Sequence, residues 1–435
     1  MNKTSAALTL ALCLTVLSAP ACAASPSGQT GVPAVGCAAF LDSLGVNTHI
    51  DQGYNPEHYL DPLRYLGIRN IRDGGRNLQG DLMLHREAGV RVDLVVEDLL
   101  TLETSAKTLA NAQALLAIEG PNEPNNFPIA YKGQKGGGEG SWKPVAAFQA
   151  ALYKAVKSDP LLEHYPVFAV SEGGAETDNA GMQFLTVPKG AGTEFPEGTK
   201  FADYANAHNY VSGHGNLYSD NQAWQAADPV LNGRWDGLYV EYGKTWKKHF
   251  KAYSKAELQR LPRVTTETGW DSLDNSGGER AQGTVLVNTC LAQFKRGWRY
   301  TFIYELGDGE GGTGHQGLYR KDGTPKPVAT SIHNLTTILA DDKPLAHPGS
   351  LAYAIPNEPE TVHDLLLQKS DGVFYLVVWG EKVSGFENVS VDLGKPHAEI
   401  RIYDVTKGTA PLSTLHNAAQ IPLKLSDHAM VAEIR

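Results

Sequence analysis

Short apolar runs alternate with longer stretches of helical periodicity between about residues 40 and 342. Runs such as LLAIEGPNEPN and RVTTETGW include apolar segments of strand length, whereas WKPVAAFQAALYKAVKSD repeats apolar residues at the spacing of an amphipathic helix. This alternation predicts parallel strands covered by helices. About eight strand–helix steps follow one another, of which the fifth helix is the least clear. We therefore expect an α/β fold, a (β/α)8 TIM barrel, in preference to an open sheet.

The pattern changes at about residue 343, after which helical periodicity disappears. Segments such as VFYLVVWGE, NVSVDL and AEIRIYDV have the length and composition of separate short strands. The dipeptide Asp371-Gly372, between two of the apolar segments, is typical of hairpin turns. Residues 343–435 are therefore predicted to form a C-terminal antiparallel β-sandwich domain that follows the barrel of residues 40–342.

Residues 1–24 have the layout of a secretory signal peptide. Lys3 supplies a positive charge, residues 6–17 form a short apolar run, and the small residues Ala21 and Ala23 follow. The run is too short to span a bilayer. An ordinary buried N-terminal helix is the alternative. The signal peptide predicts a secreted or periplasmic protein that does not reside in a membrane.

Charge and cysteine content narrow the classes of function. The chain has 38 Lys and Arg against 48 Asp and Glu, a formal net charge of −10, so it lacks the positive charge that nucleic-acid binders concentrate. Its four cysteines form no zinc-binding pattern. The Gly-rich segment KGQKGGGEGS lacks the Gly-Lys-Ser/Thr of a phosphate loop and is interpreted as a flexible active-site loop. We expect no cofactor and no metal ion. Cys37 and Cys290 either pair with each other or remain buried thiols.

Polar residues gather at the C-terminal ends of the predicted strands, where barrels of this kind carry their catalytic groups. Glu123 follows the fourth strand and Glu267 ends the seventh, on opposite sides of the barrel mouth. Cleavage of a glycosidic bond needs at least two facing carboxyl groups. One protonates the departing oxygen, while the other attacks the anomeric carbon or activates water. The acid then needs a raised pKa. The nucleophile needs a cationic neighbour, for which Arg72 at the end of the second strand is a candidate.

These motifs resemble those of clan A, the retaining (β/α)8 glycoside hydrolases. The resemblance rests on Asn-Glu-Pro at the fourth strand together with Glu at the end of the seventh, and GPNEPN, TTETGW and the trailing β-domain are most similar to family 39 and its relatives. It spans the barrel, about residues 40–340. The resemblance implies that Glu123 is the acid/base and Glu267 the nucleophile.

The resemblance also implies sugar-binding positions around this pair. Asn122 would hydrogen-bond the sugar 2-hydroxyl, and Arg72 matches the second-strand arginine of the clan. His208 and Tyr210 match the pair that the clan places after strand six, where Tyr210 could touch the nucleophile. Each residue also has a structural interpretation, such as a plain salt bridge for Arg72 or a hydrogen-bonded structural histidine for His208.

The eighth strand departs from the clan pattern. Many members have a Trp there as the floor of the −1 subsite, whereas this chain has Tyr304-Glu305. Glu305 could supply a hydroxyl contact instead, but the sequence does not say which of the two side chains faces inward. His49, at the end of the first strand, and Trp270, just beyond the seventh, complete the candidate substrate-binding residues.

Three further patterns have competing interpretations. His208 and His214 could suggest a metal site, but no carboxylate completes it. The acidic, Gly-rich segment 308–312 could hold calcium, yet it lacks the spacing of an EF-hand loop and is better interpreted as a solvated loop. Aromatic residues in the loops either bind successive sugars or pack as lids; they are Trp142, Tyr218, Trp224 and Trp235.

The leading hypothesis is a secreted retaining glycoside hydrolase that cleaves a β-linked oligo- or polysaccharide by double displacement. A non-catalytic carbohydrate-binding barrel is a hypothesis of a different class. A transglycosylase using the same two glutamates is a third, because the sequence does not separate transfer to water from transfer to sugar. A carbohydrate is the expected partner in all three, with no role for nucleic acid or a membrane.

Overall fold

The computed structural model describes residues 31–171, 181–182, 184–211, 255–273, 277–312, 314–382 and 385–435. All structural statements below concern these residues. Several sequence predictions lie outside them: the signal peptide, a helix over residues 239–253, and the side chains of His214, Tyr218, Trp224 and Trp235.

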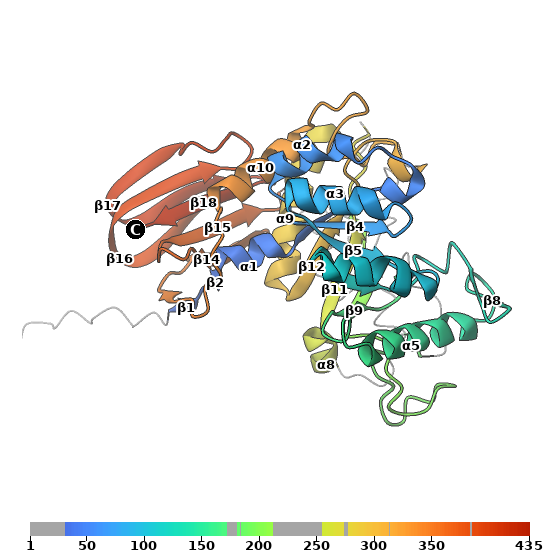
Figure 1. Ribbon diagram of the computed structural model, residues 1–435. Helices are drawn as coiled ribbons and strands as arrows, with labels where there is room; N and C mark the ends of the chain where they lie inside the picture. The colour runs from blue at the N-terminus through green and yellow to red at the C-terminus, as the bar shows by residue number, and fades with distance from the viewer. Residues whose placement is uncertain are drawn as a thin grey trace, which may run out of the picture.

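Eight parallel strands form the expected barrel (Figure 1). The strand order is β10-β11-β12-β3-β4-β5-β6-β9, so the last barrel strand in the chain, β12, pairs with the first, β3. An isolated parallel bridge joins Phe168 of β9 to Tyr204, the residue before β10, at the two edges of this sheet. The strands are β3 (Leu44–Asn47), β4 (Asn70–Gly74), β5 (Arg91–Val95), β6 (Leu115–Glu119), β9 (Val167–Phe168), β10 (Ala205–His208), β11 (Arg263–Thr268) and β12 (Trp298–Ile303). The (β/α)8 prediction is therefore confirmed.

Helices cover the outside of the barrel and close packing fills its inside. Gly45 shows how tight the interior is, because a Cβ there would lie 2.3 Å from Phe302 Cδ1. The 3-10 helices are η1 (Ile50–Gln52) and η4 (Glu310–Gly312), and a π-helical turn, η2 (Leu102–Ala106), precedes α4. The α-helices are α1 (Cys37–Asp42), α2 (Glu57–Leu66), α3 (Leu78–Ala88), α4 (Lys107–Asn111), α5 (Lys143–Ser158), α8 (Lys255–Arg260), α9 (Gly278–Lys295) and α10 (Pro327–Ile338). None of the described helices is long and apolar enough to cross a membrane.

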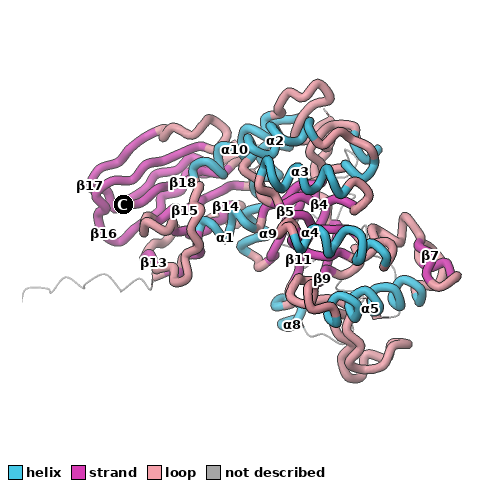
Figure 2. Tube along the Cα trace, viewed as in Figure 1, coloured by secondary structure: helices cyan, strands magenta, loops and turns pink. Residues whose placement is uncertain are grey.

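The described residues of the C-terminal domain form strands joined by loops (Figure 2). Its six-stranded sheet has the order β17-β16-β18-β15-β14-β2, and β1 pairs with β13. The two segments expected as separate strands, NVSVDL and AEIRIYDV, form one strand, β16, with a register shift between Asp392 and His397. The strands are β1 (Val32–Pro33), β2 (Val35–Gly36), β13 (Ser350–Leu351), β14 (Val362–Gln368), β15 (Phe374–Gly380), β16 (Glu387–Asp404), β17 (Ser413–Leu425) and β18 (Ala429–Ile434).

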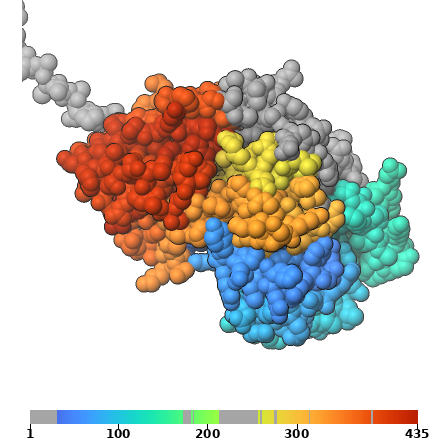
Figure 3. Space-filling model, turned by 90° about the horizontal axis from the view of Figure 1, so that it is seen from above, coloured from blue at the N-terminus to red at the C-terminus, as the bar shows by residue number. Residues whose placement is uncertain are grey.

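The C-terminal sheet packs side by side with the barrel (Figure 3). Successive side chains of a strand point to opposite faces of its sheet. Accordingly, Val377 and Trp379 belong to the hydrophobic cluster of the barrel, whereas Leu376 and Val378 belong to a second cluster within the domain. Helix α9 lies at this junction and is buried along most of its length. Its Asn288 donates a hydrogen bond to the Gly380 carbonyl at 2.9 Å.

Two sequence questions are answered by the fold. Cys37 and Cys290 are both buried free thiols, so they do not pair with each other. The Gly-rich segment is not a simple loop, because it enters a hairpin of β7 (Ile129–Tyr131) and β8 (Gln134–Gly136). At Gly137, φ is 108° and a Cβ would lie 2.3 Å from the Pro124 carbonyl oxygen, so glycine lets this segment pack against the turn that carries Glu123.

Candidate active site

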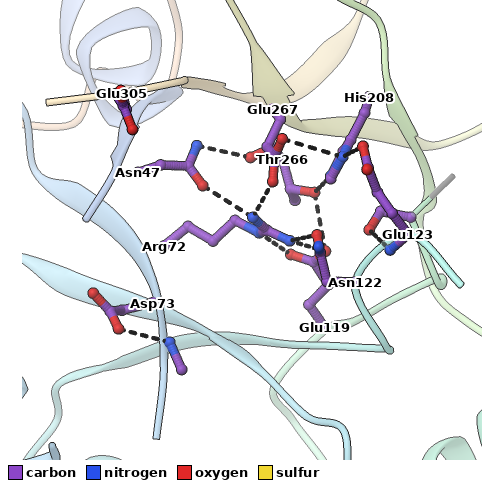
Figure 4. A network of polar contacts seen from close by, with 12 residues as sticks. Asn47, Arg72, Asp73, Glu119, Asn122, Glu123, His208, Thr266, Glu267 and Glu305 are labelled. Carbon is purple, nitrogen blue, oxygen red and sulfur yellow. Dashed lines mark hydrogen bonds and ion pairs between the residues drawn. The ribbon is translucent and has the colours of Figure 1, made fainter. Parts of the chain in front are cut away.

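The two predicted catalytic carboxylates meet at the C-terminal ends of the barrel strands (Figure 4). Glu267 lies on β11, and Glu123 follows β6 in a turn where its own φ is 39°. One oxygen of each carboxylate and one ring nitrogen of His208 lie within 4.8 Å of one another. Retaining glycosidases hold their carboxyl groups about 5–5.5 Å apart, and inverting enzymes about 6.5–9.5 Å. The spacing therefore fits direct attack by one carboxylate.

Both oxygens of Glu267 accept hydrogen bonds, which fixes the plane of the carboxylate. Arg72 Nη1 donates to Oε1 at 2.7 Å, and the Tyr210 hydroxyl donates to Oε2 at 2.5 Å. The Glu267 side chain is 10% exposed. A carboxylate held beside a guanidinium and a phenol is suited to be the nucleophile, and the structure places Arg72 and Tyr210 where the sequence analysis expected them.

Arg72 is held in place by a buried network. Its Nε and Nη2 donate to both oxygens of Glu119 at 2.7 and 2.9 Å, in the two-pronged geometry that arginine favours. The same guanidinium donates to Asn47 Oδ1 at 3.0 Å and to Asn122 Oδ1 at 2.8 Å. With its Oδ1 occupied, Asn122 has its amide N–H groups to offer a sugar hydroxyl.

Sequence reasoning missed Glu119 and Asn47. Glu119 ends β6, is fully buried, and stands four residues before Glu123 in LLAIEGPNEP. Its position at the end of an apolar run could have identified Glu119 from the sequence. A glutamate buried there needs a charged or hydrogen-bonding partner, which points to a polar network. Asp93 on β5 is also fully buried, and burial together with the Glu119 charge raises its pKa well above the usual range.

Glu123 has different neighbours from Glu267. Nδ1 of His208 lies 2.6 Å from Glu123 Oε1, and Asn126 Nδ2 donates to Oε2 at 2.7 Å. Burial raises the pKa of Glu123, but the hydrogen bond and charge of His208, the Asn126 amide and Arg72 outweigh it and lower the pKa to about 2. These contacts oppose the raised pKa that the sequence analysis expected of the acid.

His208 links the two glutamates. Its Nδ1 contacts Glu123 and also lies 3.4 Å from Glu267 Oε2, while its Nε2 lies 3.0 Å from Thr266 Oγ1. The Thr266 hydroxyl lies 3.1 Å from Glu119 Oε1. Burial lowers the pKa of His208, but the charge of Glu267 and the hydrogen bond and charge of Glu123 raise it above its ordinary value.

Tyr304 and Glu305, which stand where the clan pattern has a Trp, both lie beside other residues of the candidate site. The Tyr304 ring lies 6.1 Å from the ring of Tyr210 and 5.3 Å from that of His49, edge to face in both cases. Glu305 is fully buried, with Oε2 3.8 Å from His49 Nδ1. Tyr304 therefore packs against Tyr210 and His49, whereas the carboxylate of Glu305 lies near His49.

The remaining predicted residues lie around this centre. His49 Nδ1 is 3.4 Å from Glu310 Oε2, so this histidine is held by a carboxylate of η4. Trp270 is only 1% exposed and belongs to the main hydrophobic core, which favours a packing role. Trp142 is 4% exposed and donates its indole N–H to the Gly138 carbonyl at 3.1 Å, the contact expected of a packed loop.

The cluster of Glu123, His208 and Glu267 has the size of a metal site, but its contacts favour another role. Both Glu267 oxygens already accept hydrogen bonds, one of them from the Arg72 guanidinium, whose charge repels a cation. His208 Nδ1 lies at hydrogen-bond distance from Glu123. Hydrogen-bonded acid–base groups therefore describe this cluster better than metal ligands do.

The acidic segment 308–312 is also accounted for by protein contacts. Asp308 Oδ1 accepts from Lys326 Nζ at 2.6 Å and from the Gly317 backbone N–H at 2.9 Å. Lys326 is 1% exposed, so this is a buried ion pair. These contacts disfavour the calcium interpretation of the segment.

Comparisons with known proteins agree with the fold. No protein-family model matches the chain, and a search of curated proteins found no match. Among solved structures, a family 39 glycoside hydrolase from the gut symbiont Bacteroides cellulosilyticus WH2 is similar at a TM-score of 0.58 and 15% identity, covering 91% of this chain and 81% of that one. AbfB, a family 51 α-L-arabinofuranosidase from Bifidobacterium longum, matches at 0.56 and 12%, over 94% of this chain and 98% of its own.

A third similar structure is the family 30 subfamily 8 xylanase Xyn30A from Clostridium acetobutylicum, with a TM-score of 0.55 and 11% identity over 90% and 95% of the two chains. These neighbours are clan A glycoside hydrolases. The resemblance stated from the sequence motifs is thus confirmed at the level of the fold, which the chain shares with them over nearly all of its length.

Proposed function

We propose that this protein is a retaining glycoside hydrolase that cleaves a β-linked oligo- or polysaccharide by double displacement. The observation that carries the proposal is the pair of carboxylates, Glu123 and Glu267, with one oxygen of each within 4.8 Å of the other. Fold similarity supports it but does not carry it, since one fold hosts many activities. Residues 1–24 support export of the protein from the cytoplasm as part of the same proposal.

In the first step, Glu267 attacks the anomeric carbon while Glu123 protonates the departing oxygen. The Arg72 and Tyr210 hydrogen bonds hold the attacking carboxylate in one orientation, which favours a near-attack geometry. In the second step, Glu123 takes a proton from water, which displaces the sugar from Glu267. Two inversions at the same carbon leave the product with the configuration of the substrate.

Assaying hydrolysis of a panel of aryl glycosides and polysaccharides tests the activity and identifies the sugar that the enzyme cleaves. β-Xylosides and xylan belong in it because a neighbour is a xylanase, and α-L-arabinofuranosides because another is an α-L-arabinofuranosidase. Proton NMR of the first product formed then gives its configuration. A β-glycoside should release the β-anomer first; release of the α-anomer would contradict double displacement.

A matched pair of variants ties the activity to the site. Glu267→Gln should abolish turnover on every substrate that the wild type cleaves. Glu433→Gln is the control, because Glu433 also accepts hydrogen bonds from a tyrosine, Tyr403 at 2.6 Å, and an arginine, Arg435 at 2.6 Å, but lies in the C-terminal domain. It should keep wild-type turnover. Equal loss in both variants would mean that folding, not chemistry, was perturbed.

The alternative hypotheses give different results in the same panel. A non-catalytic binding barrel would retain polysaccharide in affinity electrophoresis without cleaving any member of the panel. A transglycosylase would release the aryl group but give longer oligosaccharides in place of free sugar. Both glutamates and their distinct partners favour hydrolysis or transfer over binding alone.

A further inference from the structure

A surface groove formed by the β7–β8 hairpin and helix α5 has no part in the site described above. It is a cavity of about 730 Å³, closed on a third side by Glu194 and Phe195. Its volume lies within the range of about 300–1,000 Å³ that is usual for ligand sites in proteins. The described residues that line it combine two aromatic rings, a floor of small side chains and a rim of polar groups.

The two aromatic rings of the groove are Tyr131 and Phe195, and each is held by a fully buried phenylalanine. Tyr131 on β7 packs edge to face against Phe148, with the ring centres 5.4 Å apart, and Phe195 packs edge to face against Phe201 at 5.6 Å. Tyr131 and Phe195 themselves are half-buried. Part of each ring therefore stays open to a ligand while its orientation is fixed, and a ring that is already ordered loses little entropy on binding.

Small side chains of α5 form the floor of the groove. Ala147 and Ala151 lie four residues apart, and therefore on one face of the helix. Pro144, near the start of the helix, continues this apolar surface. These short side chains leave the space between the two rings open, and they present no polar atom that a ligand would have to satisfy.

Polar groups stand at the rim. Lys143 Nζ lies 3.1 Å from Glu194 Oε1, and both side chains are more than half exposed. Lys132 Nζ lies 5.2 Å from the centre of the Tyr131 ring, and the exposed amide of Gln134 lines the same cavity. Ammonium and amide N–H groups donate hydrogen bonds, whereas carboxylate and amide oxygens accept them. The rim thus offers both donors and acceptors beside the aromatic surface.

This combination fits a sugar chain. The apolar C–H face of a sugar ring covers an aromatic ring, while its hydroxyl groups exchange hydrogen bonds with polar neighbours. A phosphate-bearing ligand would call for an excess of cations, but Glu194 pairs with one of the two lysines that line the groove. The charge of the rim is therefore nearly balanced, as suits a neutral ligand rich in hydroxyl groups.

The groove is built on the segment that follows the candidate acid/base. The Gly138 N–H donates to the Pro124 carbonyl at 2.8 Å, and the hairpin lies against the start of α5, where a Cβ at Gly136 would come within 2.8 Å of Pro144 (Figure 1). Tyr131 stands eight residues after Glu123 in the chain, so their Cα atoms are at most about 29 Å apart. A polysaccharide is long enough to reach both places, whereas a single sugar is not.

We propose that this groove is an accessory glycan-binding site, which holds a stretch of the polysaccharide away from the bond that is cleaved. The inference rests on the proposed function, from which it takes its occupant, and it deepens that function by adding a preference for a polymer over a short glycoside. Stacking on the two rings and hydrogen bonds at the rim hold the chain.

Affinity electrophoresis of the whole protein tests binding without turnover. Glu267→Gln is run in native gels that contain soluble xylan, arabinan or mixed-linkage β-glucan, so that the polymer is not cut during the run. At least one of these polymers should retard the protein. Tyr131→Ala and Phe195→Ala, each added to Glu267→Gln, should raise the apparent Kd for that polymer about fivefold or more, because each removes an anchoring ring.

Three further variants separate the loss of a contact from a loss of folding. Tyr131→Phe keeps the ring and should keep most of the affinity. Ala147→Trp removes no ring but fills the floor of the groove, and it should weaken retardation as much as Tyr131→Ala does. Phe386→Ala is the matched control, because Phe386 is also a part-exposed ring with a lysine, Lys424, over it, but lies in the C-terminal domain. It should be retarded like Glu267→Gln alone.

Kinetics on two substrates give a second readout. Tyr131→Ala in the otherwise unchanged enzyme should lower kcat/KM about fivefold or more on the polymer that is bound. It should leave kcat/KM unchanged on the aryl glycoside of the single sugar, which occupies the active site alone. Equal loss on both substrates would overturn the inference, because the hairpin would then act through the shape of the active site.

The gels also give results that would overturn the inference. These are retardation by none of the polymers, and retardation that Tyr131→Ala, Phe195→Ala and Ala147→Trp all leave unchanged. A dimer in sedimentation that Tyr131→Ala dissociates, with retardation unchanged, would mean that the groove holds a second copy of the chain. Any of these results in a protein that cleaves glycosides would leave the proposed function standing. Retardation that depends on the groove, in a protein that cleaves no glycoside, would refute that function alone.

Discussion

Asp81→Asn should stabilise the protein, and by an amount that depends on pH. Asp81 lies in the first turn of α3, fully buried, and burial together with the charges of Asp73 and Asp51 raises its pKa to about 9. Neither of its carboxyl oxygens has a hydrogen-bond partner among the described residues. The folded protein therefore holds a neutral carboxyl at pH 7, whereas the unfolded chain exposes an ionised one.

The size of the effect follows from the two pKa values. A raised pKa in the folded state stabilises it below the unfolded value of 3.8, and that stability is lost as the pH rises towards about 9. At pH 7 the loss is about 4 kcal/mol, from about 1.4 kcal/mol per pH unit. Asparagine does not titrate and escapes this loss. Burial of its amide and the loss of any favourable helix-terminus effect offset part of the gain, which leaves about 2–3 kcal/mol.

Urea unfolding of both proteins at pH 3 and pH 7 measures this difference. The variant should be more stable at pH 7, and its advantage should vanish at pH 3, where the unfolded carboxyl is also largely protonated. Asp61→Asn is the matched control, because the Asp61 side chain is 97% exposed, and it should change stability at neither pH. A difference for Asp81→Asn that is the same at both pH values would refute the reasoning, since it would show that the carboxyl does not bind its proton more tightly in the folded state.

Three further results are expected. Tyr210→Phe removes the O–H that contacts Glu267 Oε2 at 2.5 Å and should lower kcat/KM about 10- to 100-fold with the fold intact; unchanged kinetics would show that this hydrogen bond does not orient the nucleophile. Cys37 and Cys290, whose pKa values burial raises to about 12, should resist a thiol reagent in the native protein and react fully in urea; missing thiols in urea without reductant would indicate a disulfide. Glu119→Gln should reduce stability at pH 7, because it removes one partner of the buried Arg72 pair, by up to about 3–5 kcal/mol; an unchanged urea midpoint would show that Arg72 is held without it.

The sequence predicts the barrel well because its signal is local. Alternation between short apolar runs and helical periodicity places each strand, and the rule that barrel chemistry lies at strand ends then selects Arg72, Glu123, His208 and Glu267. The structure brings these four side chains into one connected network. Their roles in catalysis remain predictions for the experiments above.

What the sequence could not supply depends on distances across the fold. Glu119 and Asn47 are polar residues at the ends of buried strands, where an apolar pattern does not show which side chain meets the Arg72 guanidinium. The pKa of Glu123 goes down because His208, 85 residues away in the chain, lies 2.6 Å from it. Likewise, the pairing of β2 with β14 joins Val35 to Leu367, which no local pattern indicates.

The central claim is that Glu267 attacks the sugar and Glu123 handles the proton, and azide rescue tests it most directly. An aryl glycoside with an acidic phenol should still form the glycosyl-enzyme in Glu123→Ala, because it leaves without a proton, and azide, which needs no base, should then restore turnover and give a glycosyl azide of retained configuration. In Glu267→Ala, azide should enter from the side of the missing carboxylate and give the inverted glycosyl azide. The opposite pair of products would mean that the two roles are exchanged, and full activity of both variants without azide would contradict the assignment of this site.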